Sequence, residues 1–185
     1  MTDETRTLLR ALPSLAGAPP ALDLDALPET PTDLFLAWLD EAIRAGVPEP
    51  HAMTLATVSD DGPDGRVLLL KDVDARGWAF ASERSSAKGD QLAARPAAAL
   101  TFWWQPLVRS VRVKGPVVEA PVGESLADLR ARPLEAQQRT SPEDWTLWRV
   151  AATHVEFWQG SPDRCHVRVH YERPAGADGP WILSR

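Results

Sequence analysis

The sequence contains one cysteine, Cys165, and no apolar run near the about 20 residues that span a bilayer. A lone cysteine excludes an internal disulfide framework and fits a reducing compartment. The first ten residues, MTDETRTLLR, carry acids where a secretory signal would carry a basic patch. We therefore expect a cytoplasmic protein without a membrane partner.

Basic residues are fewer than acidic residues: the 20 Lys and Arg and the 26 Asp and Glu give a net charge of −6. This balance excludes a broad electrostatic footprint for nucleic acid, so any anion must be bound locally. The 185 residues, 44% of them hydrophobic, are enough to bury a core, and we expect one domain. Tyrosine occurs once but tryptophan eight times, and we expect most of the tryptophans in the core.

The N-terminal part is rich in proline and alanine without a sustained period. Residues 1–29 therefore predict a flexible arm, with at most one helical turn, ahead of a domain over residues 30–185. The stretch TPTDLFLAWLDEAIRAG next predicts a helix capped by Thr30 and ended at Gly46. Its expected apolar face consists of Leu34, Phe35, Trp38, Leu39 and Ile43.

After this helix the pattern changes to short β-branched or aromatic runs between Gly, Pro and Asp turns. Strands are predicted at residues 52–58, 66–73, 77–82, 97–104, 108–120, 154–159, 166–173 and 181–184. Two further helices are predicted within residues 85–96 and 123–133, each ended by a proline. The predicted fold class is mainly β with flanking helices (α+β), as a barrel or a sandwich.

Cations recur at the predicted strand ends and beside the helix that follows ERSSAKG. If they converge, they form one phosphate-binding surface, to which the free amides of that helix's first turn add donors. The alternative is a set of solvated strand ends paired with nearby acids, and spacing alone favours it because exposed Lys and Arg are common. The cations are Arg66, Lys71, Arg84, Lys88, Arg109, Arg112, Arg132, Arg164 and Arg168.

The stretch FWQGSPDRCHVRVHYER concentrates titratable groups. Arg164, His166 and Arg168 alternate, which predicts three side chains on one face of a strand. An imidazole there could move protons or donate to a substrate oxygen, whereas the alternative is a packing face with solvated arginines. The paired spacing of a zinc site is missing and Cys165 would point to the opposite face, so no metal is expected.

The segments RVLLLK, SSAKG, ALTFWW, VRSVRVKG, LRARP and VEFWQGSPDRCHVR follow one another in a recognisable order. From Met53 to the C-terminus, the sequence resembles the pyridoxamine 5′-phosphate oxidase family. The resemblance implies an FMN-binding split β-barrel that works as a homodimer with flavin at the subunit interface. It also implies FMN-dependent oxidation of pyridoxamine or pyridoxine 5′-phosphate to pyridoxal 5′-phosphate by O2, with release of H2O2.

The resemblance also implies roles for individual residues. Arg164 and His166 would be catalytic and lie over the substrate ring, and Lys71 and Arg132 would contact the substrate phosphate. The implied FMN-binding residues are Arg66, Val67, Leu68, Leu69, Leu70, Lys71, Ser82, Lys88, Ser110, Trp158 and Arg168.

The sequence departs from the family pattern at several of these positions. Ala87 replaces an arginine beside the flavin phosphate, and Ser110 replaces a glutamine. Asp128 and Ala136 stand where the family has a tyrosine and a serine near the substrate phosphate, and residues 133–145 form a shortened segment. A carboxylate at Asp128 would repel a phosphate. An FMN-dependent oxidase or reductase of another small molecule, a non-catalytic flavin- or vitamer-binding protein, and an interaction module without flavin therefore stay open.

Overall fold

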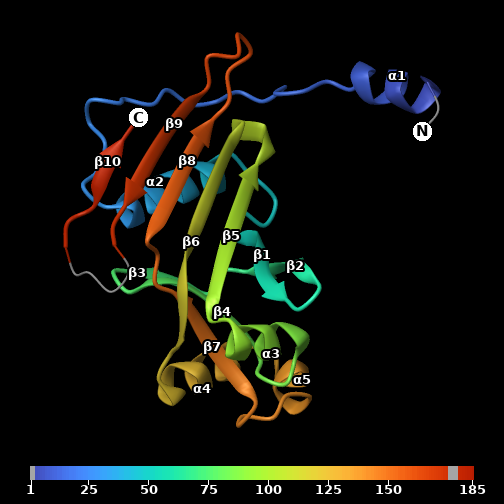
Figure 1. Ribbon diagram of the computed structural model, residues 1–185, viewed down its shortest axis with the longest axis vertical. Helices are drawn as coiled ribbons and strands as arrows, with labels where there is room; N and C mark the ends of the chain where they lie inside the picture. The colour runs from blue at the N-terminus through green and yellow to red at the C-terminus, as the bar shows by residue number, and fades with distance from the viewer. Residues whose placement is uncertain (1–2, 175–178) are drawn as a thin grey trace.

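The computed structural model describes residues 3–174 and 179–185, which form a mainly antiparallel β fold with flanking helices (Figure 1). The larger sheet has the strand order β10-β9-β8-β6-β5-β1-β2, and β3, β4 and β7 extend it into a second, smaller sheet. The strands are β1 (Ala52–Ser59), β2 (Gly62–Leu69), β3 (Asp72–Asp74), β4 (Gly77–Glu83), β5 (Ala97–Trp104), β6 (Arg109–Glu119), β7 (Trp145–Val150), β8 (His154–Gln159), β9 (Val167–Glu172) and β10 (Ile182–Ser184).

Strand β6 belongs to both sheets. Its first half, from Arg109 to Lys114, pairs with β8, and its second half, from Val117 to Glu119, pairs with β7. The change of partner occurs at Gly115, where a Cβ atom would lie 2.3 Å from the carbonyl oxygen of Ala151. A side chain would block this close approach, so glycine allows one strand to connect the two sheets.

The core lies between the larger sheet and α2 (Pro31–Arg44). As predicted, Thr30 caps α2 by accepting a hydrogen bond from the backbone N–H of Asp33. Phe35 and Trp38 of α2 make edge-to-face ring contacts with Trp78, Phe102 and Phe157.

One part of the predicted apolar face of α2 is wrong. Ile43 is 58% exposed, because the buried stripe continues from Trp38 to Ala42 instead.

The remaining helices are α1 (Asp3–Ala11), α3 (Ala87–Ala94), α4 (Val122–Ala131) and α5 (Leu134–Gln138), with a 3-10 turn η1 (Gln105–Leu107). Helices α3 and α4 lie where the sequence predicts them. Helix α1 is longer than the single turn expected in the arm, and it lies away from the sheets in Figure 1. The chain after α1 is held to the fold by hydrogen bonds from Ala18 N–H to Pro106 O and from the Tyr171 hydroxyl to Pro28 O, each 2.8 Å. The division at residues 29 and 30 stays a prediction.

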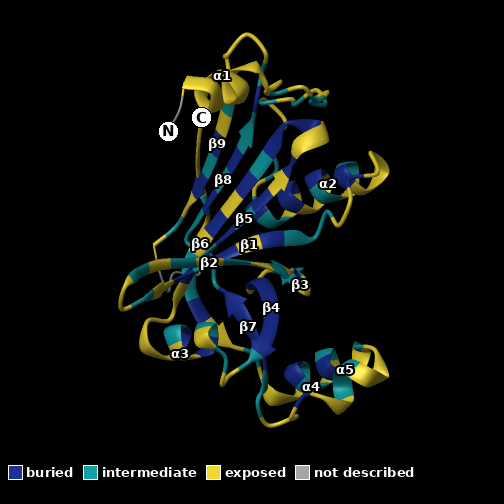
Figure 2. Ribbon diagram, turned by 90° about the vertical axis from the view of Figure 1, so that its right-hand side faces the viewer, coloured by how far each residue is buried: buried dark blue, intermediate teal, exposed yellow. Residues whose placement is uncertain are grey.

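Two strand predictions need correction. The strand predicted over residues 66–73 is interrupted, because β2 ends at Leu69 and β3 begins at Asp72. Between them the backbone N–H of Lys71 donates to Ala79 O, so Lys71 leaves β2. Strand β7 is not among the predicted strands: residues 146–150 are all buried, so the sequence lacks the alternation that marks a half-exposed strand. Figure 2 shows β4 and β7 as the most deeply buried pair.

No helix in the described part of the chain is both long and apolar enough to cross a membrane.

Candidate functional site

Arg66 and Lys88 form a pair of neighbouring cations at the N-terminus of α3. Arg66 on β2 donates to the Thr57 hydroxyl at 2.5 Å and to the Gln91 side-chain oxygen at 3.1 Å, and it pairs with Asp64. Lys88, in the first turn of α3, donates from Nζ to the Ser86 hydroxyl at 2.9 Å.

Burial lowers the pKa of the Lys88 ammonium, and the charge of Arg66 lowers it further. An ammonium whose charge is disfavoured by burial and by a neighbouring cation is poised to accept an anion. Ser86, which caps α3, and the backbone amides at the α3 N-terminus add hydrogen-bond donors for the same anion.

The other residues of the predicted flavin strand face different surroundings. Val67 and Leu69 are 69% and 37% exposed, Leu68 is half-buried, and Leu70 is buried. Ser82 is buried on β4 and donates to the carbonyl oxygen of its neighbour Glu83 at 3.3 Å. Val67 and Leu69 therefore lie on the exposed face of the edge strand β2, and Arg66 lies on its other face.

A second cluster surrounds Asp128 on α4. One carboxylate oxygen lies 3.9 Å from Lys71 Nζ, and the other accepts a 2.9 Å hydrogen bond from the Trp145 indole N–H. The guanidinium of Arg132 lies 4.1 Å from the centre of the Trp145 ring and donates to the Thr140 hydroxyl at 3.1 Å. The fold thus joins Lys71 and Arg132, both predicted to contact substrate, through Asp128 and Trp145.

A third group lies on the outward face of the larger sheet, where Trp103, Ser110, Trp158 and Arg168 are neighbours in one cross-strand row. The Trp103 and Trp158 ring centres lie 6.1 Å apart, and the His166 ring centre lies 5.1 Å from that of Trp158. We call Trp103, Ser110, Trp158, His166 and Arg168 the aromatic row. It presents flat ring surfaces on a face that no described element covers.

His166 is fixed in one tautomer. The backbone N–H of Ser161 donates to His166 Nδ1 at 3.0 Å, so Nδ1 is an acceptor. In the neutral imidazole the proton therefore resides on Nε2, which makes that atom the available donor.

The predicted alternation of Arg164, His166 and Arg168 on one strand face is wrong. Strand β9 begins at Val167, and Arg164 is an exposed residue of the preceding turn with a φ of 68°. Only Arg168 takes a strand position, opposite Trp158. The turn residues Ser161 and Asp163 satisfy each other and the backbone N–H of Cys165 locally, which favours a turn over a strand there.

The nine cations do not converge on one continuous surface. Arg109 is buried and contacts Glu41 and the Trp38 ring, while Arg84 and Arg112 pair with acids on the surface. Arg84, Arg109 and Arg112 therefore form local ion pairs, as the alternative interpretation of the sequence predicts. Arg66 and Lys88, Lys71 and Arg132, and Arg168 remain in the three separate groups described above.

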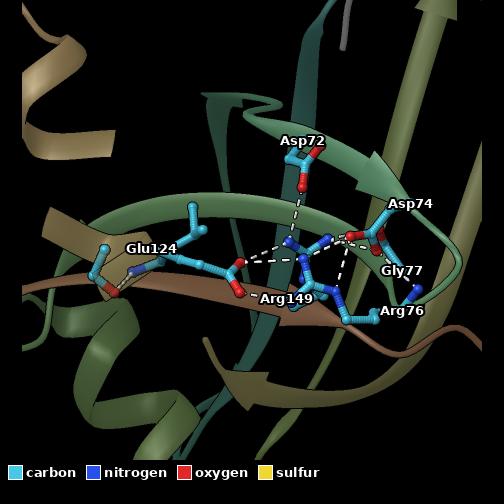
Figure 3. A network of polar contacts seen from close by, with 8 residues as sticks. Asp72, Asp74, Arg76, Gly77, Glu124 and Arg149 are labelled. Atoms are coloured by element: carbon cyan, nitrogen blue, oxygen red, sulfur yellow. Dashed lines mark hydrogen bonds and ion pairs between the residues drawn. The ribbon is translucent and has the colours of Figure 1, made fainter. Parts of the chain in front are cut away.

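Sequence reasoning missed Arg149, which is only 3% exposed and contacts three carboxylates (Figure 3). It donates to Asp72 at 2.9 Å, Asp74 at 3.0 Å and Glu124 at 3.3 Å. Arg76 also contacts Asp74 and Glu124, and its hydrogen bond, together with the Arg149 charge, holds the pKa of Glu124 below its usual range. We call these five residues the Arg149 network.

The Arg149 network joins α4 to the β3–β4 turn and to β7. An arginine inside the otherwise apolar stretch WTLWRV is the signal that could have revealed it, since a buried guanidinium needs partners.

The donor set at Arg66 and Lys88 fits a phosphate monoester, and the exposed apolar strand edge and the indole rings fit a planar ring. Within the described residues, no group of three His, Cys, Asp or Glu side chains is placed to hold a metal ion. Cys165 is exposed and has a free thiol.

Comparison with known proteins identifies relatives along nearly the whole chain. The family model described as pyridoxamine 5′-phosphate oxidase matches residues 39–159, and that of the pyridoxine 5′-phosphate oxidase C-terminal dimerisation region matches residues 145–185. The pyridoxine/pyridoxamine 5′-phosphate oxidase of Bordetella avium is 41% identical over 187 residues, covering 84% of this chain and 88% of its own. The protein of the same name from Thermosynechococcus vestitus is also 41% identical, covering 82% and 87%.

Solved structures show the same fold. PhzG from Burkholderia lata, in complex with tetrahydrophenazine-1-carboxylic acid, superposes with a TM-score of 0.80 at 25% identity and covers 91% of this chain and 98% of its own. A pyridoxamine 5′-phosphate oxidase-related, FMN-binding protein from Nostoc punctiforme has the same fold, with a TM-score of 0.62 at 19% identity, covering 86% and 97%. The predicted split β-barrel is confirmed, and the chain belongs to the pyridoxamine 5′-phosphate oxidase family.

Proposed function

We propose that the chain is an FMN-dependent oxidase of a small planar amine or alcohol, with the same reaction type as its curated relatives. The observation that carries this proposal is the Arg66–Lys88 pair at the N-terminus of α3. Its partly buried ammonium beside a guanidinium suits the phosphate of FMN, and Ser86 and the α3 amides add hydrogen bonds. The exposed edge at Val67 and Leu69 would lie along the flavin ring.

The aromatic row would form the opposite wall of the site. Trp158 would pack against the planar groups, and Ser110 and Arg168, its neighbours in register, would donate hydrogen bonds to them. The row lies on the uncovered sheet face, and the match to a dimerisation region supports a homodimer in which a second copy covers that face. Each site would then contain residues from both protomers.

FMN, when bound, would supply the redox chemistry by which the substrate carbon that carries the amine or alcohol loses a hydride equivalent and a proton, and O2 takes up the two electrons and two protons to form H2O2. The chain's own contribution is position and charge. His166 would donate from Nε2 to a substrate oxygen, and Arg164 would add a cation above the substrate ring. Lys71 and Arg132 would face the far end of the substrate.

The curated relatives supply the first candidate substrates, pyridoxamine and pyridoxine 5′-phosphate. PhzG, bound to a ring carboxylic acid, supports a second candidate class, planar molecules that carry a carboxylate. The Lys71–Asp128 pair favours this second class, because the Asp128 carboxylate already neutralises Lys71, one of the two cations at the far end.

The test is a titration of the purified protein with FMN, followed by quenching of flavin fluorescence and then by peroxide release. We expect saturation at one flavin per chain, and H2O2 formed in proportion to the amine or alcohol consumed. Flavin that binds but is not reduced by any tested substrate would favour the non-catalytic binding protein. Failure to bind FMN would contradict the proposal.

A further inference from the structure

Asp128 is placed between the two cations that the proposed function assigns to the far end of the substrate. Its carboxylate lies 3.9 Å from Lys71 Nζ and is hydrogen-bonded to the Trp145 ring that Arg132 covers. The Asp128 side chain is 14% exposed and that of Lys71 is 30% exposed, so water only partly screens this charge pair.

The position of Asp128 is imposed by the fold. Glu124 lies one turn earlier on α4, and the Arg149 network attaches it to Arg76 at 2.6 Å and to Arg149 at 3.3 Å (Figure 3). The hydrogen bond from the Trp145 indole then fixes the Asp128 carboxylate itself. Asp128 therefore cannot easily rotate away when an anion approaches Lys71.

The surrounding charges do not restore an excess of positive charge. In the Arg149 network, the carboxylates of Asp72, Asp74 and Glu124 outnumber the guanidiniums of Arg76 and Arg149. Asp128 is the counter-ion of Lys71. Lys71, Arg132 and Asp128 together carry one net positive charge, and the Arg149 network beside them carries one net negative charge. A phosphate monoester carries about −1.5 to −2 at neutral pH, whereas a carboxylate carries one negative charge.

We propose that Asp128 is a specificity-determining residue that makes this subsite accept a substrate bearing a single carboxylate in preference to one bearing a phosphate. The inference rests on the proposed function, which places the far end of the substrate at Lys71 and Arg132. A carboxylate would pair with the Arg132 guanidinium and leave the Lys71–Asp128 pair intact. A phosphate would bring a second negative charge against Asp128, a repulsion that is strong in a partly shielded site.

The experiment compares three ligands that share one ring and carry a methyl group at C4 in place of the carbon that bears the amine or alcohol in the vitamers. They are 4-deoxypyridoxine 5′-phosphate, 4-deoxypyridoxine, and the analogue with a carboxylate at the same ring position, 5-hydroxy-4,6-dimethylpyridine-3-carboxylic acid. Their dissociation constants are measured by calorimetry on the FMN-saturated wild-type protein, Asp128→Asn and Asp40→Asn. Asparagine at position 128 removes the charge but keeps an oxygen for the Trp145 N–H. Asp40 pairs with Arg44 on the exposed side of α2, so its variant is the matched control.

We expect the wild-type protein and Asp40→Asn to bind the carboxylate at least tenfold more tightly than the phosphate. In Asp128→Asn the affinity for the phosphate should rise at least tenfold, while that for uncharged 4-deoxypyridoxine should stay within about twofold. Tighter binding of the phosphate by the wild-type protein, the same preference in Asp128→Asn, or no binding of any of the three would overturn the inference. Flavin loading and peroxide release are measured separately, so failure of the proposed function would be recognised independently.

Discussion

The charged ammonium of Lys88 suits an anionic ligand but destabilises the folded protein when no ligand is bound. Burial and the Arg66 charge lower the pKa of Lys88 from its ordinary value of 10.5. Between that lowered pKa and 10.5, the unfolded chain binds more protons at this residue than the folded chain does. The free energy of unfolding therefore increases with pH across this window, and below it the cost of the buried charge is present in full.

A bound phosphate should remove this cost, because it stabilises the charged ammonium. We therefore expect FMN affinity to fall as pH rises through the lowered pKa of Lys88. Lys88→Ala should weaken FMN binding about tenfold or more at neutral pH, the size of a hydrogen bond to a charged group, and should flatten this pH dependence. Fluorescence titrations between pH 7 and 10.5 measure both effects.

Lys88→Arg provides the control, since arginine keeps its charge throughout this range. It should retain most of the affinity without the alkaline loss. An identical pH profile in the wild-type protein and Lys88→Arg would show that another group titrates.

The sequence predicted individual residues unevenly. The order of the segments was enough to identify Arg66 and Lys88 as candidates, and the structure brings them together. The burial of Arg109 and the identity of the carboxylates around Arg149 could not be predicted, because both depend on which elements pack over a strand position. The prediction that Arg164 and His166 lie on one strand face was wrong, because these residues belong to a local turn and not to a strand.

At the scale of elements, two turns need glycine for different reasons. One needs its backbone conformation alone, and the other also needs the volume that a Cβ atom would fill. Gly77 and Gly62 both have positive φ values, 128° and 122°. A Cβ at Gly77 would lie 1.9 Å from the carbonyl oxygen of Val150, whereas a Cβ at Gly62 would meet nothing within 4 Å. The β3–β4 turn therefore needs both the conformation and the empty volume, while the β1–β2 turn needs only the conformation.

We expect Gly62→Ala to lower the free energy of unfolding by about 1–2 kcal/mol, the usual cost of a strained φ. Gly77→Ala should cost more, about 3 kcal/mol or above, because β4 must also move away from β7. Urea denaturation of both variants and the wild-type protein measures the difference. Equal losses would mean that the close approach to Val150 is easily relieved.

The elements that sequence reasoning recovered are those with strong periodic patterns or turn signals. Helix α2, with its Thr30 cap, and the hairpin turn at residues 74–77 follow the sequence directly. The β1–β2 turn is shorter than predicted, because β2 already begins at Gly62. Strand β7 and the short helix α5 were missed, the first because it is buried on both faces and the second because five residues carry too little pattern.

At the scale of the whole molecule, the outward face of the larger sheet lacks a covering element among the described residues. Trp103 on the inner strand β5 is 49% exposed on this face, and Val67 and Ile182 are more exposed on the edge strands β2 and β10. Large apolar side chains gathered on one sheet face are typical of a protein interface. With the match to a dimerisation region, this supports a second copy of the chain as the covering partner.

We expect the wild-type protein to sediment as a homodimer. Trp103→Glu should raise the dimer dissociation constant at least tenfold, because it places a carboxylate in the desolvated interface, and Trp103→Phe should change it much less. Sedimentation equilibrium across a range of protein concentrations measures these constants. A monomeric wild-type protein would contradict the assignment of this face.

The fold class could be predicted from the sequence, because alternating apolar runs between turns indicate a β-rich domain. The strand order could not, since the pairing of β6 with β8 and then with β7 depends on contacts between residues distant in the sequence. For the same reason, the sequence alone did not divide the candidate residues among three separate groups.

The sharing of β6 between the two sheets has a consequence for how the molecule opens. The sheet that contains β4 and β7 holds Ser82 and the Arg149 network, and the larger sheet holds the aromatic row. Because both sheets pair with β6, separating β6 from either sheet leaves backbone N–H and C=O groups of the other sheet without hydrogen-bond partners. The two halves should therefore unfold as a single cooperative unit, with backbone amides of β7 exchanging with solvent as slowly as those of β8.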